Sequence, residues 1–251
     1  MSRCLVTGHR GYIGSEVFKR LEEMGHEVMG IDLKDGHDIL CELKPDSDGK
    51  FHPHWANFKP EYIFHLAAIP RVAYSVEHPV EVIENNVLSS LYILEFARSV
   101  GAKRVIYSSS SSVRGDGRGP ENPYGASKYM PESMCGVWSR LYDIDTVCLR
   151  YFNVYSPDQT ASGPYATAVA NWMQHIRDNK NPFITGDGEQ RRDMAHKVVF
   201  DYIPPREGDV LCTKADISKI GDAGWVPKHD ILEGIAECFA LLKKELEDKN
   251  E

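Results

Sequence analysis

The sequence predicts an α/β fold built on a doubly wound parallel sheet, and three observations carry that prediction. Short, continuous apolar runs recur through the first 150 residues of the 251-residue chain, as is typical of strands buried on both faces of a sheet. Segments with apolar residues at helical spacing separate these runs. A glycine-rich turn joins the first apolar run to the first helical segment, so the chain opens with a β-α-β unit.

Each apolar run is expected to form one strand, and each amphipathic segment the crossover to the next strand. Such alternation gives parallel strands joined by right-handed crossovers, which is the Rossmann-like class. The expected strands are residues 3–7, 27–31, 62–66, 104–107 and 146–150, and the expected helices are residues 11–24, 80–100 and 124–142.

The other segments carry weaker patterns. Residues 34–60 are polar, and we expect a solvated loop there. His52 and His54 lie in this stretch without a third ligand at matching spacing, so no metal site is predicted. In the last third we expect a helix over residues 165–179, short segments near Ile184 and Val198, and a final helix over residues 231–246.

Composition and charge limit the possible partners. The net charge is −8 and no basic block is present, which disfavours a nucleic-acid surface. No apolar run reaches the roughly 18 residues that a membrane span needs. The chain begins at Met1 and runs directly into a strand, so we expect no signal peptide. The six cysteines form no Cys-x-x-Cys pattern, and reduced cysteines in a cytoplasmic protein are the expectation.

The turn after the first strand has the spacing of a phosphate-binding loop. Gly8, Gly11 and Gly14 follow one another at three-residue intervals, which allows a tight turn and close approach of backbone N–H groups to a pyrophosphate. An acidic residue, Asp32, ends the second expected strand, where a carboxylate bonds ribose hydroxyls and disfavours a 2′-phosphate. NAD is therefore the predicted cofactor. Arg10 in the same loop could instead meet a 2′-phosphate, which keeps NADP as an alternative.

Tyr124 and Lys128 are the candidate acid/base pair. Residues four apart share one face of a helix, and a neighbouring ammonium lowers the pKa of a phenol from its ordinary value of about 10. Such a pair could move a proton on and off a sugar hydroxyl. This spacing also arises by chance on amphipathic helices. The glycine loop and the serine cluster at residues 108–112 strengthen the functional interpretation.

Several motifs occur together in a specific order. They are Thr7–Gly14, Phe64–Ala68, Asn85–Val87, Ser108–Gly115, Tyr124–Lys128, Arg150–Val154, Gly186–Asp193 and Arg206–Asp209. Over most of its length the chain thereby resembles the extended short-chain dehydrogenase/reductase family, specifically the NAD-dependent nucleotide-sugar epimerases of the UDP-glucose 4-epimerase type.

The resemblance implies a role for each matching residue. Asp38 and Ile39 would flank the adenine, and Asn86 would lie near the nicotinamide half of NAD. The implied cofactor-binding residues are Gly8, Arg10, Gly11, Tyr12, Ile13, Gly14, Asp32, Asp38, Ile39, Leu66, Ala67, Ala68, Asn86, Tyr124, Lys128, Tyr151 and Phe152. The implied catalytic residues are Ser110, Tyr124 and Lys128, and the implied substrate-binding residues are Asn153, Arg192, Arg206 and Asp209.

By the same resemblance, the expected reaction is epimerisation of a nucleotide sugar through a transient 4-keto sugar, and the expected nucleotide is UDP. Dehydratases of this family carry an Asp-Glu pair where this chain has Ser111 and Ser112, so epimerisation is favoured over dehydration. A dehydratase or a reductase is the alternative enzyme. A non-catalytic protein that binds NAD or a nucleotide sugar is the alternative of another class.

Two departures from the family pattern concern the substrate site. Only 13 residues separate Ser110 from Tyr124, and Arg114 stands where an aromatic residue is usual. Several dozen residues are also missing after Lys197. We therefore expect an NAD-binding domain over residues 1–155 and a small substrate-binding lobe over residues 156–251.

Compact chains of this type often pair through their two long helices. The corresponding segments here are residues 80–100 and 124–142. By that resemblance we expect a homodimer held together by a four-helix bundle.

Overall fold

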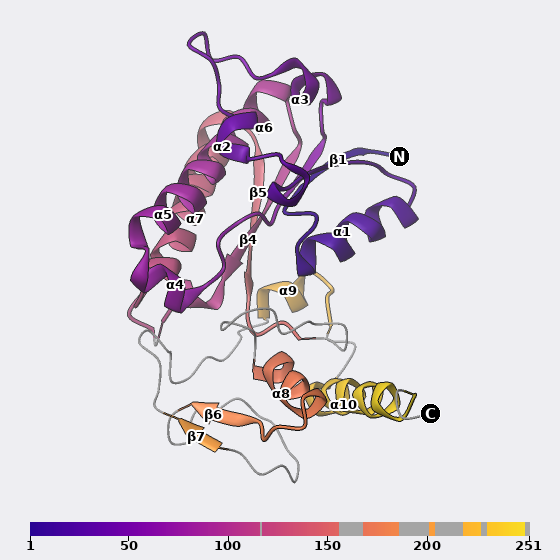
Figure 1. Ribbon diagram of the computed structural model, residues 1–251. Coiled ribbons are helices and arrows are strands. Elements are labelled where there is room, and N and C mark those ends of the chain that lie inside the picture. Colours follow the sequence, from indigo (N-terminus) through magenta and orange to yellow (C-terminus); the bar gives the residue numbers. More distant parts are fainter. Residues whose placement is uncertain (116, 156–167, 186–200, 204–217, 227–229, 249–251) are drawn as a thin grey trace. The chain divides into compact units, whose positions relative to one another are not determined.

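The computed structural model describes residues 1–115, 117–155, 168–185, 201–203, 218–226 and 230–248. The chain divides into two compact units, Met1–Tyr151 and Phe152–Glu251. Each unit is described by itself below, and the labels are those of Figure 1.

The first unit contains the predicted parallel sheet. Its strands are β1 (Arg3–Thr7), β2 (Glu27–Ile31), β3 (Tyr62–His65), β4 (Arg104–Ser110) and β5 (Asp145–Tyr151). They lie in the order β2-β1-β3-β4-β5, and every neighbouring pair is parallel. The doubly wound prediction is thereby confirmed. The order reverses between β1 and β3, and in such sheets ligands bind outside the carboxyl ends of the strands at this switch point.

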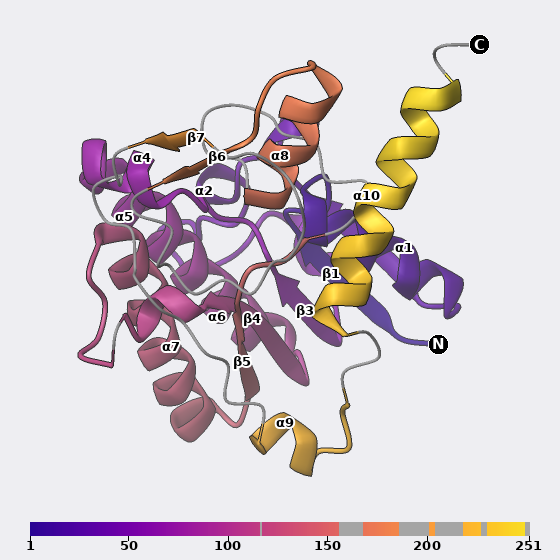
Figure 2. The ribbon, with the colours of Figure 1, turned by 90° about the horizontal axis from the view of Figure 1, so that it is seen from below.

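Helices cover both faces of this sheet. On one side lies α1 (Tyr12–Glu23), which packs on β1 and β2. On the other side, α6 (Ser89–Val100) packs on β3 and β4, and α7 (Pro123–Tyr142) packs on β4 and β5 (Figures 1 and 2). Leu5, Ile63, Phe96 and Tyr107 are among the buried residues of the core that results.

The predicted helix over residues 80–100 is three helical segments in succession. They are α5 (Pro79–Ile83), the π-helical turn η2 (Glu84–Leu88) and α6. A π turn inserts an extra residue into the helical ladder, and such bulges occur frequently at functional sites. Asn86, buried with 1% of its surface exposed, lies at the centre of the turn.

The prediction of a solvated loop over residues 34–60 was wrong. This stretch holds most of the 3₁₀ turn η1 (Leu33–Asp35), as well as α2 (Ile39–Glu42) and α3 (Pro53–Phe58). Leu43 and Trp55 are buried in the core, and the Trp55 indole donates to Glu42 at 2.8 Å. Helices of one turn show no amphipathic period, so the sequence pattern did not reveal them.

Side-chain caps start these short helices. His52, considered above as a metal ligand, accepts a hydrogen bond from the His54 N–H at 3.3 Å and begins α3. Asp38 does the same for α2, accepting from the Leu40 N–H at 2.8 Å. Two further short segments, α4 (Val72–Glu77) and η3 (Ser111–Val113), flank the start of α7.

The second unit is smaller in its described content. It has α8 (Ala168–Arg177), a parallel strand pair β6 (Phe183–Thr185) and β7 (Asp201–Ile203), α9 (Ser218–Asp222) and α10 (Ile231–Asp248). Within the described residues, α8 confirms the predicted helix over 165–179 and α10 the one over 231–246. Ile184 lies in β6, and Val198 lies outside the described residues. A cluster of buried apolar side chains joins α8 to α10: Val169, Met173, Cys238 and Leu242. Among the described residues, no helix is both long enough and apolar enough to cross a membrane.

Glycine is required where α7 meets the serine loop, residues 108–112. This close contact gives a test of the packing. A Cβ added to Gly125 would lie 2.6 Å from the Ser112 carbonyl oxygen, whereas one added to Gly136, on the same helix, would meet only the end of the Arg140 side chain at 3.5 Å. We expect Gly125→Ala to destabilise the protein by about 2 kcal/mol through overpacking. Gly136→Ala is the matched control and should stabilise it by about 0.5–1 kcal/mol. Urea unfolding curves measure both, and equal effects of the two substitutions would contradict the close approach.

Candidate active site

The glycine loop forms a cradle that side chains would fill. Gly8 has φ +70°, and a Cβ there would lie 2.8 Å from the Ala67 backbone nitrogen. The Gly11 N–H donates to the Gly8 carbonyl at 2.9 Å, and a Cβ on Gly14 would collide with that same carbonyl. The loop therefore packs directly against the turn after β3 and opens α1. Backbone N–H groups at such a helix start suit a pyrophosphate, so the residues present fit a dinucleotide.

Asp32 lies at the end of β2, where the predicted ribose ligand should be. Its carboxylate accepts hydrogen bonds from the Arg10 N–H and from the Lys34 N–H, both at 2.9 Å. These two bonds fix the carboxylate beside the glycine loop and leave it partly exposed. Tyr12, with 40% of its surface exposed, and Ile13 follow in the first turn of α1. The structure thus brings the loop residues and Asp32 together, as the sequence predicted.

The adenine-flanking pair predicted from the resemblance lies at the start of α2. Asp38 uses one carboxylate oxygen to cap this helix. The Ile39 side chain is 6% exposed and packs in the core, because the first residue of α2 turns inward. Contact of this pair with the adenine stays a prediction.

A chain of buried hydrogen bonds begins at Thr7, just before the glycine loop. The Thr7 hydroxyl accepts from the N–H groups of Leu66 (3.2 Å) and Ala67 (3.1 Å). Its own proton is therefore available for His65 Nδ1, 2.8 Å away. Nδ1 must then be the acceptor and Nε2 the protonated nitrogen, which donates to Ser90 at 3.0 Å. The Ser90 hydroxyl donates in turn to the Asn86 carbonyl at 2.7 Å.

His65 is neutral in this chain. Burial, together with the nearby charge of Lys128, lowers the pKa of the imidazole to about 3. A neutral ring with one donor and one acceptor is what the flanking hydroxyls require. His65 therefore contributes to the structure and not to proton transfer near neutral pH.

This chain of hydrogen bonds continues through the Asn86 side chain to α7, the helix that carries Tyr124. The Asn86 amide oxygen accepts from the Ile69 N–H at 2.8 Å, while its nitrogen donates to the Ile69 carbonyl (3.2 Å) and to the Ser127 hydroxyl (2.9 Å). Ser127 donates to the Tyr124 carbonyl at 2.8 Å, and the Tyr124 N–H donates to Ser75 at 3.0 Å. The resemblance implies that Asn86 lies near the nicotinamide half of NAD, and this stays a prediction. Its amide is buried and holds the loop after β3 against α7.

Ser110 and Tyr124, two of the expected catalytic residues, are brought together at the end of β4. Asn122 caps α7 by accepting from the Gly125 N–H at 2.8 Å, and this places Tyr124 in the first helical turn. Ser110 accepts from the Ser112 N–H at 3.2 Å, and its hydroxyl lies close enough to the Tyr124 phenol to act on the pKa of Tyr124 as a hydrogen-bond partner. A hydroxyl pair of this kind can hold and pass a single proton.

The pKa of Tyr124 does not follow the sequence-based expectation. Burial raises it above the ordinary value of a phenol, and the hydrogen bond with Ser110 offsets only part of that effect. Lys128 was expected to lower it. In the structure the Lys128 ammonium instead donates to the Ser108 carbonyl at 2.9 Å and lies 5.2 Å from the centroid of the Tyr107 ring.

Lys128 is a buried cation. It is 4% exposed, and desolvation lowers the pKa of its ammonium to about 8. Within the described part of the chain, its polar contact is the Ser108 carbonyl and no carboxylate pairs with it. Unpaired buried charges are costly, so this position is poised for a ligand that offers oxygen acceptors.

The structure places the remaining candidates less completely. Ala68 lies in the loop after β3, and Tyr151 ends β5 opposite Ser110 in the strand register. Phe152 and Asn153 begin the second unit. The predicted substrate residues Arg192, Arg206 and Asp209 lie outside the described residues. No group of three or more potential metal ligands occurs among the residues described.

Sequence reasoning missed the residues that hold this site in place. They are Thr7, His65, Ser75, Ser90 and Ser127. A signal was present for one of them, because a histidine within the apolar run Phe64–Leu66 must find hydrogen-bond partners when the strand is buried.

The comparisons with known proteins agree with this geometry. The model of the NAD-dependent epimerase/dehydratase family matches residues 4–202. This chain belongs to that family. Membership confirms the predicted family and NAD as its cofactor.

The relatives extend over nearly the whole chain. A putative UDP-glucose 4-epimerase of Methanocaldococcus jannaschii is 31% identical over 299 aligned positions, which cover 95% of this chain and 98% of that protein. A UDP-glucuronate 4-epimerase of Thermodesulfobacterium geofontis is 30% identical, with 98% of each chain covered. Since 299 positions exceed the 251 residues present, the first alignment contains gaps in this chain, which agrees with an internally shortened member.

A solved structure is similar as well. The UDP-glucose 4-epimerase of Thermotoga maritima, determined with UDP-glucose, has a TM-score of 0.82 at 27% identity, covering 97% of this chain and 99% of that one. These similarities confirm the prediction of an NAD-dependent epimerase with a Rossmann-like fold.

The burial of Lys128 gives a test that separates stability from function. The folded-state pKa of about 8 lies below 10.5, the ordinary value of a lysine side chain, so the folded protein binds this proton less tightly than the unfolded chain does. The penalty is full below pH 8, declines as pH rises, and vanishes above the unfolded value. We expect Lys128→Met to stabilise the cofactor-free protein at pH 7 by up to about 3 kcal/mol, and to abolish turnover.

Thermal unfolding of the cofactor-free proteins between pH 7 and pH 11 measures this effect. The difference between wild type and Lys128→Met should shrink across that range. Lys19→Met, at an exposed position on α1, is the control and should change stability little. A variant that is less stable than wild type at pH 7 would show that the Lys128 charge is well compensated.

Proposed function

We propose that this chain interconverts the epimers of a UDP-sugar at the sugar C4 position, with Ser110, Tyr124 and Lys128 as its catalytic residues. The observation that carries the proposal is the placement of the Ser110 hydroxyl beside the Tyr124 phenol, close enough to lower the pKa of that phenol. Buried hydrogen bonds tie Tyr124 to the loop after β3, which packs against the glycine loop. The relatives that act on UDP-glucose and UDP-glucuronate support the nucleotide and the reaction. Which sugar is turned over is the first question for experiment.

The residues divide the proton chemistry between them. NAD, when bound, supplies a reversible acceptor for the hydride of the sugar carbon. Tyr124 takes the proton of the sugar hydroxyl as the ketone forms and returns it when the ketone is reduced. Ser110 donates to the same sugar oxygen and orients it toward Tyr124. Because the proton and the hydride both return to the sugar, no net oxidation occurs.

Lys128 is proposed to hold a ribose hydroxyl of the cofactor and to lower the pKa of Tyr124 in the loaded enzyme. Its ammonium donates to the Ser108 carbonyl. A cation that moves nearer to the phenol favours the phenolate. We therefore propose that the pKa of Tyr124, which burial raises, falls when the cofactor binds.

The substrate side of the proposal rests on the second unit. Asn153, Arg192 and Arg206 would bind the substrate diphosphate, since two guanidinium groups can recognise it bidentately, and Asp209 would bind the nucleotide ribose. Residues 1–155 then hold NAD and residues 156–251 hold the substrate. The proposed location is the cytoplasm, and no cysteine of the described part of the chain forms a disulfide.

A dehydratase is the second candidate within the family. Removal of water across two carbons needs an acid and a base near the sugar. Ser111 and Ser112 form the η3 turn beside Ser110, and neither side chain can supply a carboxylate. Epimerisation is therefore favoured.

The direct test is to denature the purified protein and assay released NAD(H), and to incubate intact protein with UDP-glucose, UDP-glucuronate and UDP-N-acetylglucosamine. We expect retained NAD and formation of the C4 epimer of at least one sugar, read by chromatography. A 4-keto-6-deoxy product would point to the dehydratase. No epimer together with NADPH consumption would point to a reductase.

Tyr124→Phe tests the assigned base. Removing the hydroxyl eliminates the proton acceptor, so turnover should fall by about 10²–10⁴-fold or more, while NAD binding and the melting temperature stay close to wild type. Tyr142→Phe is the matched control on the same helix, because its exposed ring keeps the contact with Arg98 after the change. Unchanged turnover in Tyr124→Phe would overturn the mechanism.

A homodimer is also proposed, through the helices of one sheet face. On α7, Met130, Val137 and Leu141 are exposed by 44%, 36% and 66%, and their spacing places them along one side of the helix. Leu88 and Val80, on η2 and α5, are exposed too. Apolar side chains gathered on neighbouring helices often mark an interface.

We expect light scattering at micromolar concentration to give the mass of a dimer. Leu141→Glu, which puts a charge into the proposed interface, should shift the protein to monomers. Met24→Glu, at an exposed position at the end of α1, should not. A wild-type monomer at this concentration would exclude the proposed pairing.

A further inference from the structure

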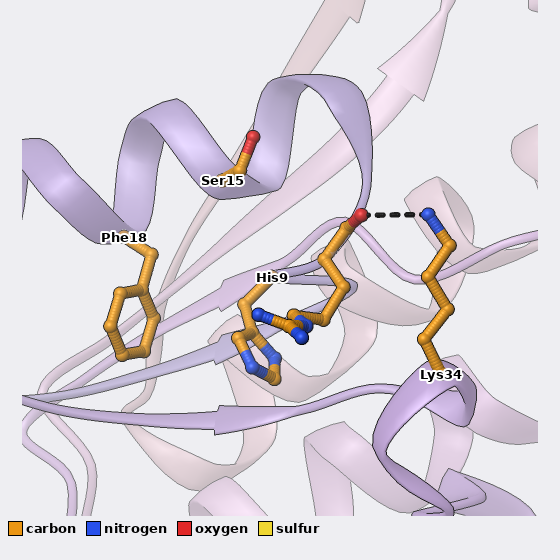
Figure 3. Close-up of a pocket in the computed structure, with 5 residues that line it drawn as sticks. His9, Ser15, Phe18 and Lys34 are labelled. Atoms are coloured by element: carbon orange, nitrogen blue, oxygen red, sulfur yellow. Dashed lines mark hydrogen bonds between the residues drawn. The ribbon is translucent and has the colours of Figure 1, made fainter.

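The His9 ring is wedged against the sheet beside the glycine loop. A Cβ on Gly30 of β2 would lie 2.5 Å from the ring, so the absence of a side chain there makes room for it. The Phe18 ring of α1 packs on it with 5.2 Å between the centroids. The His9 ring is therefore held by contacts on two sides; Figure 3 draws it with the Phe18 ring.

The Asp35 carboxylate bridges the His9 ring and the Arg10 guanidinium. His9 Nε2 lies 3.0 Å from one carboxylate oxygen, and Arg10 Nε lies 3.2 Å from the other. Since a carboxylate only accepts, Nε2 carries the proton of a neutral His9. Both oxygens of Asp35 are thus engaged, and the Arg10 side chain is drawn toward Asp35.

The same Arg10 is tied to Asp32 through its backbone. The Arg10 N–H donates to Asp32 at 2.9 Å, and the Arg10 carbonyl accepts from the Lys34 ammonium at 2.9 Å (Figure 3). His9, Arg10, Ser15, Phe18 and Lys34 line a pocket of about 640 Å³ at this place. The backbone of both basic residues therefore holds the Asp32 carboxylate, while the Arg10 guanidinium lies on Asp35 and the Lys34 ammonium on the Arg10 carbonyl.

This arrangement bears on the choice between NAD and NADP. An arginine near the acidic residue at the end of β2 is the usual means of accommodating a 2′-phosphate. Here the guanidinium already has a carboxylate partner, and that partner adds a second negative charge to the one on Asp32. A 2′-phosphate would have to displace Asp35 from Arg10 and would meet both carboxylates.

We propose that Asp35 is a second residue that determines selectivity for NAD over NADP, acting by holding the Arg10 guanidinium. It is a positioning residue, because it acts on the cofactor through Arg10. The proposal rests on NAD binding at the glycine loop and is independent of which sugar is turned over.

The test is cofactor competition on cofactor-stripped protein. Each protein is equilibrated with equal concentrations of NAD⁺ and NADP⁺, separated from free ligand, denatured, and analysed for both cofactors by chromatography. Asp35→Asn should raise the ratio of bound NADP⁺ to bound NAD⁺ by about tenfold or more, the effect of one charge-assisted hydrogen bond. Asp48→Asn, an exposed acidic position elsewhere, is the control and should leave the ratio unchanged.

The double variant Arg10→Gln/Asp35→Asn distinguishes this role from a structural one. Without the guanidinium, the ratio should fall back to within about threefold of wild type, which is non-additivity between contacting residues. If Asp35 only supports the loop, Asp35→Asn weakens both cofactors equally and the ratio does not move. That result, or a gain that persists in the double variant, would overturn the proposal.

Asp35→Ser serves as a second single variant, since it removes the charge but keeps an acceptor for His9. It should shift the ratio in the same direction as Asp35→Asn. Loss of both cofactors in both single variants would assign Asp35 to the structure of the loop and would likewise reject the selectivity role. Epimerase activity is not needed for the readout, so failure of the proposed function leaves this test intact.

Discussion

The site depends on one directional chain of buried hydrogen bonds that joins the cofactor loop to the catalytic helix. Thr7 can give its single proton only to His65, because two backbone N–H groups already donate to its oxygen. His65 Nε2 then donates to the Ser90 hydroxyl, and that hydroxyl donates to the carbonyl of Asn86. Every step requires His65 to be neutral and protonated on Nε2, and burial ensures this by lowering the pKa of the ring to about 3. A charged His65 would present two donors and would break the chain at Thr7.

Close packing of backbone segments acts together with this chain of hydrogen bonds. Backbone segments approach so closely at Gly8 and Gly125 that a single Cβ would intrude on the Ala67 or Ser112 backbone. The first contact sets the glycine loop against the turn after β3, and the second sets α7 against the serine loop. The hydrogen bonds give these contacts their register, and the glycines allow them to be short. Together they bring Ser110 to Tyr124 although 13 residues separate the two in sequence.

The sequence predicted the sheet well because buried parallel strands leave long apolar runs, and the glycine loop because its spacing is functional. Prediction from the sequence failed where contacts between distant parts of the chain determine the local structure. The turns between residues 34 and 60 are too short to show a period, yet Trp55 anchors one of them in the core. The inward direction of Ile39 and the burial of Asn86 could not be read from a motif. The pKa of Tyr124 was predicted from its neighbour in sequence, whereas burial governs it.

The surroundings of Lys128 suit this position to holding a cofactor. Its ammonium is desolvated, and in the described structure a lone carbonyl and the face of Tyr107 receive it. That state costs stability, of the order of 3 kcal/mol at neutral pH on the scale of its pKa shift. A ligand that brings hydroxyl oxygens to the ammonium removes part of this cost, and anything that binds the native state alone stabilises it further by mass action. Relief of a buried charge therefore adds to cofactor affinity, which favours a cofactor that stays bound, as a reaction without net oxidation requires.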